Sequence, residues 1–137
     1  MSASASLKIA PTMDELERIT AIVEDLGEQD DWPPDLIFKV NLVLDELSVN
    51  IVNYGEEASE IEVCLAADAE EVRVEISDDG RPFDPLTDAI EPDLDAPLED
   101  RPIGGLGIHL VREMMDELHY SREDGKNRLA MVKRKGG

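Results

Sequence analysis

The sequence predicts a single α+β domain, a two-layer α/β sandwich in which three helices cover one face of a mixed, mostly antiparallel sheet. Two patterns predict it. Three stretches carry apolar residues at helical spacing, and other stretches have an apolar residue at every second position. With 137 residues, of which 42 % are hydrophobic, the chain can bury one core without disulfides. We therefore expect residues 1–137 to form one domain.

Charge and composition limit the class of partner. The chain has 13 Lys and Arg residues against 33 Asp and Glu residues, and the net charge of −20 repels nucleic acid and anionic membranes. The N-terminal residues lack the hydrophobic segment of a signal peptide, and no run has transmembrane length. We therefore expect a cytoplasmic protein. Its single cysteine, Cys64, is interpreted as a small core residue rather than a nucleophile.

The N-terminal part predicts a strand followed by a helix. Residues 7–9 are expected to form a short edge strand. Thr12 is expected to cap the first helix, with Glu15 three residues later completing a capping box. Gly27 is expected to end this helix. Its inner face then consists of Leu16, Ile19, Ile22, Val23 and Leu26.

The stretch Phe38–Asn53 predicts a long central helix, preceded by Trp32, which we interpret as a packing anchor. One side of the helix is apolar and consists of Leu36, Val40, Leu44, Leu47 and Ile51. Another side carries Glu46, Asn50 and Asn53 at spacing i, i+4 and i+7. Taken alone, these three residues fit a solvated helix face. They also fit a site where Mg²⁺ takes an oxygen ligand beside a carboxylate that accepts a proton.

After the central helix the apolar period changes to two. Residues 61–65 and 72–76 predict two antiparallel strands joined by a turn at 68–71. The second strand runs into Asp78, with Gly80 two residues later. A carboxylate there can accept a hydrogen bond from an exocyclic amine such as that of adenine, and a glycine lets the chain pass close to a flat base. Taken alone, the same residues fit an acidic turn.

Residues 84–103 contain four prolines, seven acidic residues and no periodicity, which is typical of a functional or disordered loop. A helix expected to reach about Leu118 follows. Its start carries backbone amides suited to a phosphate, from Gly104, Gly105, Leu106 and Gly107. This glycine pattern is neither a Walker A motif nor a Rossmann fingerprint. Two last strands are expected at 118–123 and 127–134, joined at Asp124-Gly125.

In this order, the three motifs resemble the Bergerat ATP-binding fold shared by gyrase, MutL and histidine kinases. In length the chain is most similar to the stand-alone anti-sigma-factor serine kinases of bacterial partner-switching systems, and the resemblance covers residues 7–134. It implies ATP and Mg²⁺ as cofactors. It also implies a homodimeric serine protein kinase that phosphorylates a STAS-domain anti-anti-sigma protein and sequesters a sigma factor.

The resemblance implies roles for individual residues. Glu46 is similar to the general base that activates the substrate serine, and Asn50 matches the Mg²⁺ ligand. Asp78 matches the adenine-binding carboxylate, with Gly80 beside the base. The other residues are expected around the phosphates: Gly104, Gly105, Leu106 and Gly107 in the binding turn, Arg101 of the lid 84–103 at the γ-phosphate, and Asn53 on the phosphate side of the pocket. Arg18 is assigned to the partner surface.

Two residues depart from the family pattern. Pro82 replaces the second glycine of the Asp-x-Gly-x-Gly motif, and Ala130 stands where a hydroxyl residue often helps to hold the water of the adenine site. A second hypothesis is therefore an ATP-binding interaction module without kinase activity. A third is a detached histidine-kinase catalytic domain. Neither His109 nor His119 fits a phosphoacceptor, and both are interpreted as structural or surface residues.

Overall fold

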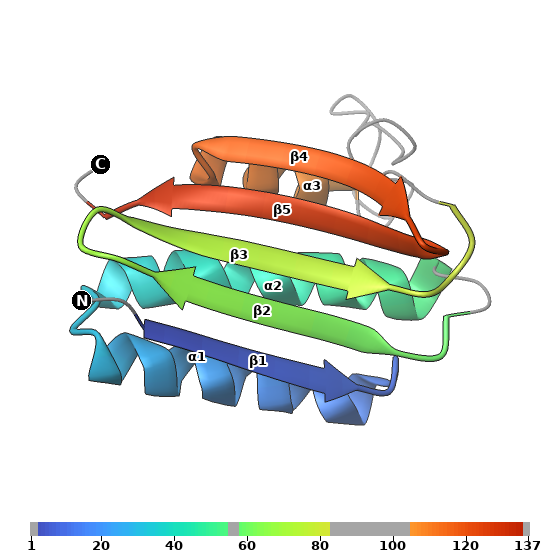
Figure 1. Cartoon of the computed structure of the whole chain (residues 1–137), viewed down its shortest axis with the longest axis horizontal. Helices are drawn as coiled ribbons and strands as arrows, with labels where there is room; N and C mark the ends of the chain where they lie inside the picture. Colours follow the sequence, from blue (N-terminus) through green and yellow to red (C-terminus); the bar gives the residue numbers. More distant parts are fainter. Residues whose placement is uncertain (1–2, 55–57, 83–104, 136–137) are drawn as a thin grey trace, which may run out of the picture.

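Five strands form one sheet, and three α-helices lie on one of its faces (Figure 1). The computed structural model describes residues 3–54, 58–82 and 105–135. The strand order is β1-β2-β3-β5-β4, and these neighbouring pairs are all antiparallel. In chain order the elements are β1 (Ala3–Ile9), the 3₁₀ helix η1 (Met13–Leu16), α1 (Glu17–Gln29), α2 (Pro34–Tyr54), β2 (Ile61–Ala67), β3 (Glu71–Asp78), α3 (Gly105–Met114), β4 (Glu117–Glu123) and β5 (Lys126–Arg134). The predicted two-layer sandwich is confirmed.

The core lies between the helices and the sheet face that they cover. Val40 and Leu44 of α2 are fully buried, and alternate residues of the strands meet them from the sheet. The inward strand residues include Ile61, Val63, Leu65, Val72, Val74, Ile76, Leu129 and Met131. The apolar sides predicted for the first and central helices form the other half of this core. Within the described residues, none of the helices combines the length and apolar character needed to cross a membrane.

β1 is longer than the edge strand expected at residues 7–9. It pairs with β2 over its whole length, from Ala3 opposite Ala67 to Ile9 opposite Ile61. The alternation that predicts a strand is weak in its first half, because the inward residues there, Ala3 and Ala5, are as small as the outward serines.

Both predicted hairpins are confirmed. Asp68 Oδ1 accepts hydrogen bonds from the backbone N–H groups of Glu70 (2.8 Å) and Glu71 (2.9 Å), which closes the turn between β2 and β3. Asp124 and Gly125 join β4 to β5 with φ values of 52° and 75°. Positive φ at both central residues is the mark of a type I′ turn, whose twist matches that of the strands.

The capping box predicted for the first helix is wrong. Thr12 has an extended backbone, and its side chain makes no capping hydrogen bond. The backbone N–H of Glu15 donates instead to Thr12 O at 3.1 Å and begins the 3₁₀ turn η1. The Glu15 carboxylate is turned to Arg18, whose Nη1 lies 3.4 Å away.

The prediction that Gly27 ends this helix is also wrong, because α1 continues to Gln29. Gly27 is buried where α1 meets α2. A Cβ atom at this position would lie 2.7 Å from Ile37 Cγ1 and 3.3 Å from Trp32 Cε3. The glycine therefore permits close packing of the two helices, and the chain turns only at Asp31, with φ of 53°.

Trp32 is 5 % exposed, which confirms its interpretation as a packing anchor. Its Nε1 donates to Asp30 Oδ2 at 2.9 Å, and Lys135 Nζ lies 2.6 Å from the same oxygen. The hydrogen bond from Lys135, and then that from Trp32, lower the pKa of Asp30 below its ordinary value. The helix α2 then begins at Pro34, four residues before Phe38, with a proline at a helix start where its missing N–H has no cost.

The helix predicted to reach about Leu118 is shorter, since α3 ends at Met114. Asp116 stops it by bonding to the sheet. Its backbone N–H donates to Val132 O at 2.9 Å, and its Oδ2 accepts from the backbone N–H of Arg134 at 2.7 Å. β4 therefore begins at Glu117, and His119, which we expected at a helix end, is an exposed residue of this strand.

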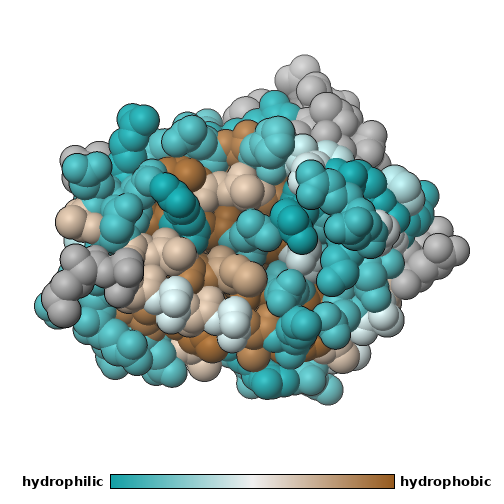
Figure 2. Space-filling model, in the orientation of Figure 1, coloured by the Kyte–Doolittle hydropathy of each residue, from teal (hydrophilic) through white to brown (hydrophobic). Residues whose placement is uncertain are grey.

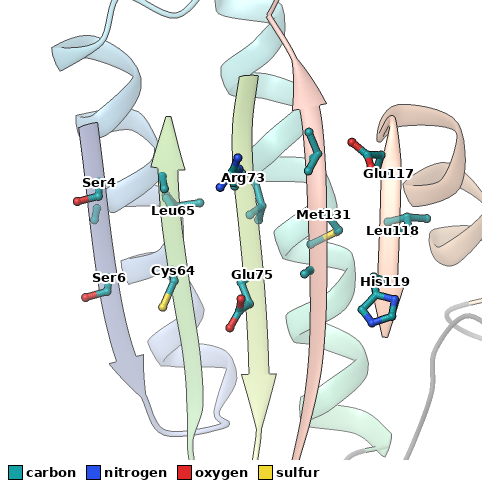
Figure 3. Close-up of a pocket in the computed structure, with 15 residues that line it drawn as sticks. Ser4, Ser6, Cys64, Leu65, Arg73, Glu75, Glu117, Leu118, His119 and Met131 are labelled. Atoms are coloured by element: carbon teal, nitrogen blue, oxygen red, sulfur yellow. The ribbon is translucent and has the colours of Figure 1, made fainter. Parts of the chain in front are cut away.

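The other face of the sheet is not covered by a helix that the structure describes. Figure 2 shows an apolar area in the middle of this uncovered face, with hydrophilic side chains around it. A hollow of about 980 Å³ runs across the strands here, with Cys64 and Glu75 among its lining residues (Figure 3). The interpretation of Cys64 as a core residue is wrong. It lies half-buried on the uncovered face, where burial, and then the charges of Glu62 and Glu75, raise the pKa of its thiol.

Candidate nucleotide-binding site

The three segments that the sequence singles out meet at one end of the molecule. α2 ends, β3 ends and α3 begins at the right-hand end in Figure 1, opposite the end where β1 begins and β5 ends. The helix α2 packs against both β3 and α3. α2, the end of β3 and the start of α3 therefore come together at one end of the molecule, and we take the polar side of α2, Asp78 and the first turn of α3 as the candidate site.

The polar side of α2 contributes Glu46 and Asn50 to this site. Asn50 is 7 % exposed, and its carboxamide forms no hydrogen bond with a residue that the structure describes. Burying a carboxamide without a partner is costly, so Asn50 is suited to a ligand. Burial raises the pKa of Glu46 above its ordinary value, and the charge of Asp45 raises it further. Asn53, the third residue predicted on this side, is exposed.

Asp78 is the last residue of β3, and its side chain lies on the helix side of the sheet with 8 % exposure. The Gly80 N–H donates to Asp78 Oδ1 at 2.9 Å, and Asn127 Nδ2 lies 3.1 Å from the same oxygen. Burial raises the pKa of Asp78, while these two hydrogen bonds oppose the rise. Oδ2 accepts no hydrogen bond from a described residue and is the oxygen left for a ligand. Gly80 is buried beside it.

The next residue, Asp79, binds the segment that precedes β2 instead of facing the candidate site. Its carboxylate accepts hydrogen bonds from the backbone N–H groups of Ser59 (2.7 Å) and Glu60 (3.0 Å), and from the Ser59 hydroxyl. The hydroxyl makes the largest contribution to the lowered pKa of Asp79. Asp79 therefore ties the end of β3 to the residues that enter β2, and of the two aspartates Asp78 is the one presented to the site.

The first turn of α3 contains Gly105, Leu106 and Gly107. The first backbone N–H groups of a helix have no partner within it and lie at the positive end of the helix dipole. A phosphate group fits such a position. Gly104, Arg101 and the lid 84–103 lie outside the described residues, and the expectations for them stay predictions.

The expectation about Ala130 is wrong. Ala130 points to the uncovered face of the sheet, whereas the residue directly opposite Asp78 on β5 is Asn127. The sequence reasoning missed Asn127. A signal was available, because Leu129 and Met131 read as core residues and strand alternation then turns Asn127 inward and Ala130 outward.

The residues present fit a Mg²⁺ ion that arrives with a nucleotide. This ion keeps several waters and takes one or two protein oxygens beside the phosphates, and the buried carboxamide of Asn50 can supply one. In residues 3–54, 58–82 and 105–135, no group of three or more His, Cys, Asp or Glu side chains is placed to hold a metal ion by itself.

Comparisons with known proteins point to one family. Residues 9–133 match the family model of the histidine kinase-like ATPase domain. The serine/threonine-protein kinase BtrW of Bordetella bronchiseptica is 36 % identical over 114 residues, which cover 80 % of this chain and 79 % of that protein. The serine-protein kinase RsbW of Bacillus cereus is 28 % identical over 96 residues, which cover 66 % of this chain and 60 % of that protein.

Two solved structures share the fold at low sequence identity. One contains the RsbU and RsbW domains of Rv1364c from Mycobacterium tuberculosis, with a TM-score of 0.66 and 13 % identity over 96 % of this chain and 32 % of that chain. The other is the catalytic domain of the histidine kinase ThkA, with a TM-score of 0.52 and 15 % identity over 96 % and 97 %. These similarities agree with the Bergerat-type sandwich. The chain belongs to the histidine kinase-like ATPase domain family, together with the serine kinases BtrW and RsbW.

Proposed function

We propose that the chain is an ATP- and Mg²⁺-dependent serine/threonine protein kinase. The observation that supports this proposal is that α2, which carries Glu46 and Asn50, packs against β3, which ends at Asp78, and against α3, and that the ends of these elements lie at one end of the molecule. Glu46 supplies a proton acceptor and Asn50 an oxygen ligand for a metal ion. Asp78 supplies a hydrogen-bond acceptor for the adenine ring, and the first turn of α3 supplies a phosphate site. The relatives BtrW and RsbW are named as a serine/threonine-protein kinase and a serine-protein kinase, which supports the same activity.

In this proposal the site binds both the adenine ring and the phosphates of ATP. Asp78 Oδ2 accepts a hydrogen bond from the exocyclic amine of adenine, while the backbone N–H groups of Gly105 to Gly107 donate to phosphate oxygens. Arg101 supplies a positive charge to the γ-phosphate, and Asn53 lines the phosphate side of the pocket. Asn50 is the protein ligand of Mg²⁺, which when bound neutralises charge on the phosphates.

Glu46 is the proposed general base. It accepts the proton of the substrate hydroxyl as the hydroxyl oxygen bonds to the γ-phosphorus and the bond from phosphorus to the ADP oxygen breaks. Burial, and then the charge of Asp45, raise the pKa of Glu46, which makes its carboxylate a stronger proton acceptor than an exposed glutamate.

The resemblance to anti-sigma-factor kinases supports a specific pair of partners. We propose that the substrate is a STAS-domain anti-anti-sigma protein and that a sigma factor is bound in the alternative state, in the cytoplasm. Arg18 on α1 has a side chain that is 53 % exposed and is available to such a partner. The large negative charge of the chain favours partner surfaces with basic residues.

We further propose that two copies pair through the uncovered face of the sheet. The net charge of −20 opposes self-association elsewhere, but strand alternation gives this face as many cations as carboxylates. The cations are Lys8, Arg73, Lys126, Arg128 and Arg134, and the carboxylates are Glu62, Glu71, Glu75, Glu117 and Glu123. Light scattering during gel filtration tests this: Ala130→Arg should give monomers, and Thr20→Arg on the exposed side of α1 should not. A monomeric wild type would contradict the pairing.

The kinase proposal is tested by transfer of label from γ-labelled ATP, with Mg²⁺, to the STAS-domain protein encoded nearest to this one. Glu46→Gln should reduce transfer by about 100-fold or more while ATP still binds. Asn50→Ala should weaken both transfer and Mg²⁺-dependent ATP binding. Glu24→Gln, at an exposed position of α1, is the matched control and should leave transfer unchanged.

The chemistry of the product separates the alternatives. Acid-stable label on serine or threonine is the expected result. Acid-labile label on a histidine would favour the detached histidine-kinase domain. ATP binding without transfer would leave the ATP-binding interaction module, and a chain that binds no ATP would contradict the proposed site itself.

A further inference from the structure

A chain of hydrogen bonds runs from β4 through β5 to the end of β3, behind the proposed base site. Tyr120 Oη donates to Asn127 Oδ1 at 2.5 Å, and Asn127 Nδ2 lies 3.1 Å from Asp78 Oδ1. Asn127 is directly opposite Asp78, and Tyr120 is opposite Leu129. All of these side chains therefore lie on the helix side of the sheet, and the edge strand β4 is connected to the carboxylate.

The groups around Asn127 determine which way its amide points. Asn127 Nδ2 donates to Arg81 O at 2.7 Å as well as to Asp78. A carboxylate and a backbone carbonyl can only accept hydrogen bonds, so the amide nitrogen must face them. The amide oxygen then faces Tyr120, which donates to it. Asp78 and the Arg81 carbonyl thus set the orientation of the Asn127 amide, and the hydrogen bond from the Tyr120 hydroxyl holds the side chain in place.

This orientation leaves one oxygen of Asp78 for a ligand. Oδ1 accepts from both Gly80 N–H and Asn127 Nδ2, whereas Oδ2 accepts from no residue in the described part of the chain. Two hydrogen bonds to one oxygen restrict rotation of the carboxylate. The site therefore presents a fixed acceptor, which suits a base with an amine at that position and repels one with a carbonyl.

The same two strands hold the turn that follows Asp78. Arg122 Nη1 of β4 donates to Gly80 O at 2.7 Å, and Asn127 holds the carbonyl of Arg81. Pro82, the departure from the usual glycine, comes directly after these two carbonyls and is exposed. The turn is thus fixed by side chains of β4 and β5 where the family pattern has a second glycine.

We propose that Asn127, held in place by Tyr120, is a positioning residue that determines the selectivity of the site for a 6-aminopurine nucleotide over a 6-oxopurine nucleotide. The inference rests on the proposed function, because it concerns the same ATP site. Without the hydrogen bond from Asn127, the Asp78 carboxylate turns and takes up a proton more readily. Asp78 then binds the amine of adenine more weakly, and it also repels the carbonyl oxygen of guanine less strongly.

The test is isothermal titration calorimetry of the full chain with ATP and with GTP, in Mg²⁺. Tyr120→Phe should weaken ATP binding about fivefold and leave GTP binding unchanged or tighter, so that the selectivity ratio, Kd for GTP divided by Kd for ATP, falls. Asn127→Ala should lower this ratio further. Ser121→Ala is the matched control on β4, because Ser121 lies on the opposite face, and should keep the wild-type ratio.

A second readout separates positioning from a merely structural role. Burial raises the pKa of Asp78, and the hydrogen bonds from Gly80 N–H and Asn127 oppose this rise, while the charge of Asp79 raises the pKa and that of Arg122 lowers it. Loss of the hydrogen bond from Asn127 should therefore raise that pKa and move the acid-side loss of ATP binding to higher pH in Asn127→Ala. If Asn127→Ala does not fold, as judged by thermal unfolding, Tyr120→Phe carries the test because it keeps the ring.

The outcomes distinguish this inference from the proposed function. Wild-type ATP binding, with an unchanged ratio of the Kd for GTP to the Kd for ATP in Tyr120→Phe and in a folded Asn127→Ala, would overturn the inference and leave the kinase proposal standing. A wild-type chain that binds neither nucleotide would overturn both. A lowered ratio in Tyr120→Phe with a normal ratio in Ser121→Ala would support the inference.

Discussion

Lys135 Nζ lies 2.6 Å from Asp30 Oδ2, although the two residues are 105 positions apart in the sequence. Both side chains are largely buried, with 19 % and 20 % exposure. This contact joins the end of β5 to the turn after α1, and the Trp32 indole donates to the same oxygen. The helix layer is thus attached to the sheet at the end opposite the candidate site.

Asp30→Asn should lower the free energy of unfolding at neutral pH by about 1 kcal/mol. Lys135 and then Trp32 lower the pKa of Asp30 in the folded state, below that in the unfolded chain. The resulting stability is present above the ordinary value of 3.8 and is lost as the pH falls through the folded-state pKa. Urea unfolding at neutral and acid pH measures this. Asp30→Asn should be less acid-sensitive than wild type, and Glu28→Gln is the exposed control. Equal acid sensitivity would contradict the assignment.

Gly27→Ala should destabilise the protein by about 1 kcal/mol, against the helix propensity that favours alanine. The added Cβ would lie 2.7 Å from Ile37 Cγ1 and 2.8 Å from its Cδ1, so the two helices must separate or Ile37 must shift. Ile37→Ala removes these atoms and should make the second change to Gly27→Ala neutral or stabilising. Urea unfolding of the four proteins of this double-mutant cycle measures the coupling. Additive effects would show that the two residues are not in steric conflict.

Asp45→Asn should move the acid side of the kinase pH–rate profile to lower pH. The charge of Asp45 adds to the effect of burial in raising the pKa of Glu46, so its removal lowers that pKa toward the ordinary value of 4.5. A general base must be ionised, and the rate therefore falls as the pH drops through its pKa. The transfer assay at a series of pH values measures the shift. Asp25→Asn, exposed on α1, should not move the profile, and an unmoved profile in Asp45→Asn would argue against Glu46 as the base.

Cys64 should react with iodoacetamide more slowly than free glutathione at mildly alkaline pH. Burial is the main cause of its raised thiol pKa, so a smaller fraction is present as the reactive thiolate. Glu75→Gln removes one of the two carboxylates that contribute and should increase the rate about two- to threefold. Glu113→Gln on α3 is the control. A rate equal to that of glutathione would contradict the raised pKa.

Periodicity predicts the strands and α-helices that the structure describes, because one-sided burial leaves its period in the local sequence. It does not predict where two of the helices end. Gly27 reads as a helix stop, but its role depends on Ile37 of another helix. Asp116 ends α3 through hydrogen bonds to Val132 and Arg134 of β5, which lie 16 and 18 residues later in the sequence. Both errors concern contacts between elements, which a single stretch of sequence does not contain.

The same distinction applies to the candidate site. Glu46 and Asn50 could be predicted because they lie on one helix at fixed spacing, and Asp78 because it ends a strand. The spacing of β5 places Asn127 on the inner side, but its position opposite Asp78 follows from the register between β3 and β5, which spacing does not give. The alternation of β5 fixes which side each residue faces, and it would have excluded Ala130 from the site.

The positions of the chain ends have a practical consequence. β1 begins and β5 ends at the end of the molecule far from the candidate site (Figure 1). A fluorophore, a purification tag or a surface tether attached at either end would leave the nucleotide end accessible to a protein-sized substrate. Single-molecule and immobilised-kinase measurements are therefore feasible. A reporter domain fused at either end would leave the candidate site unobstructed.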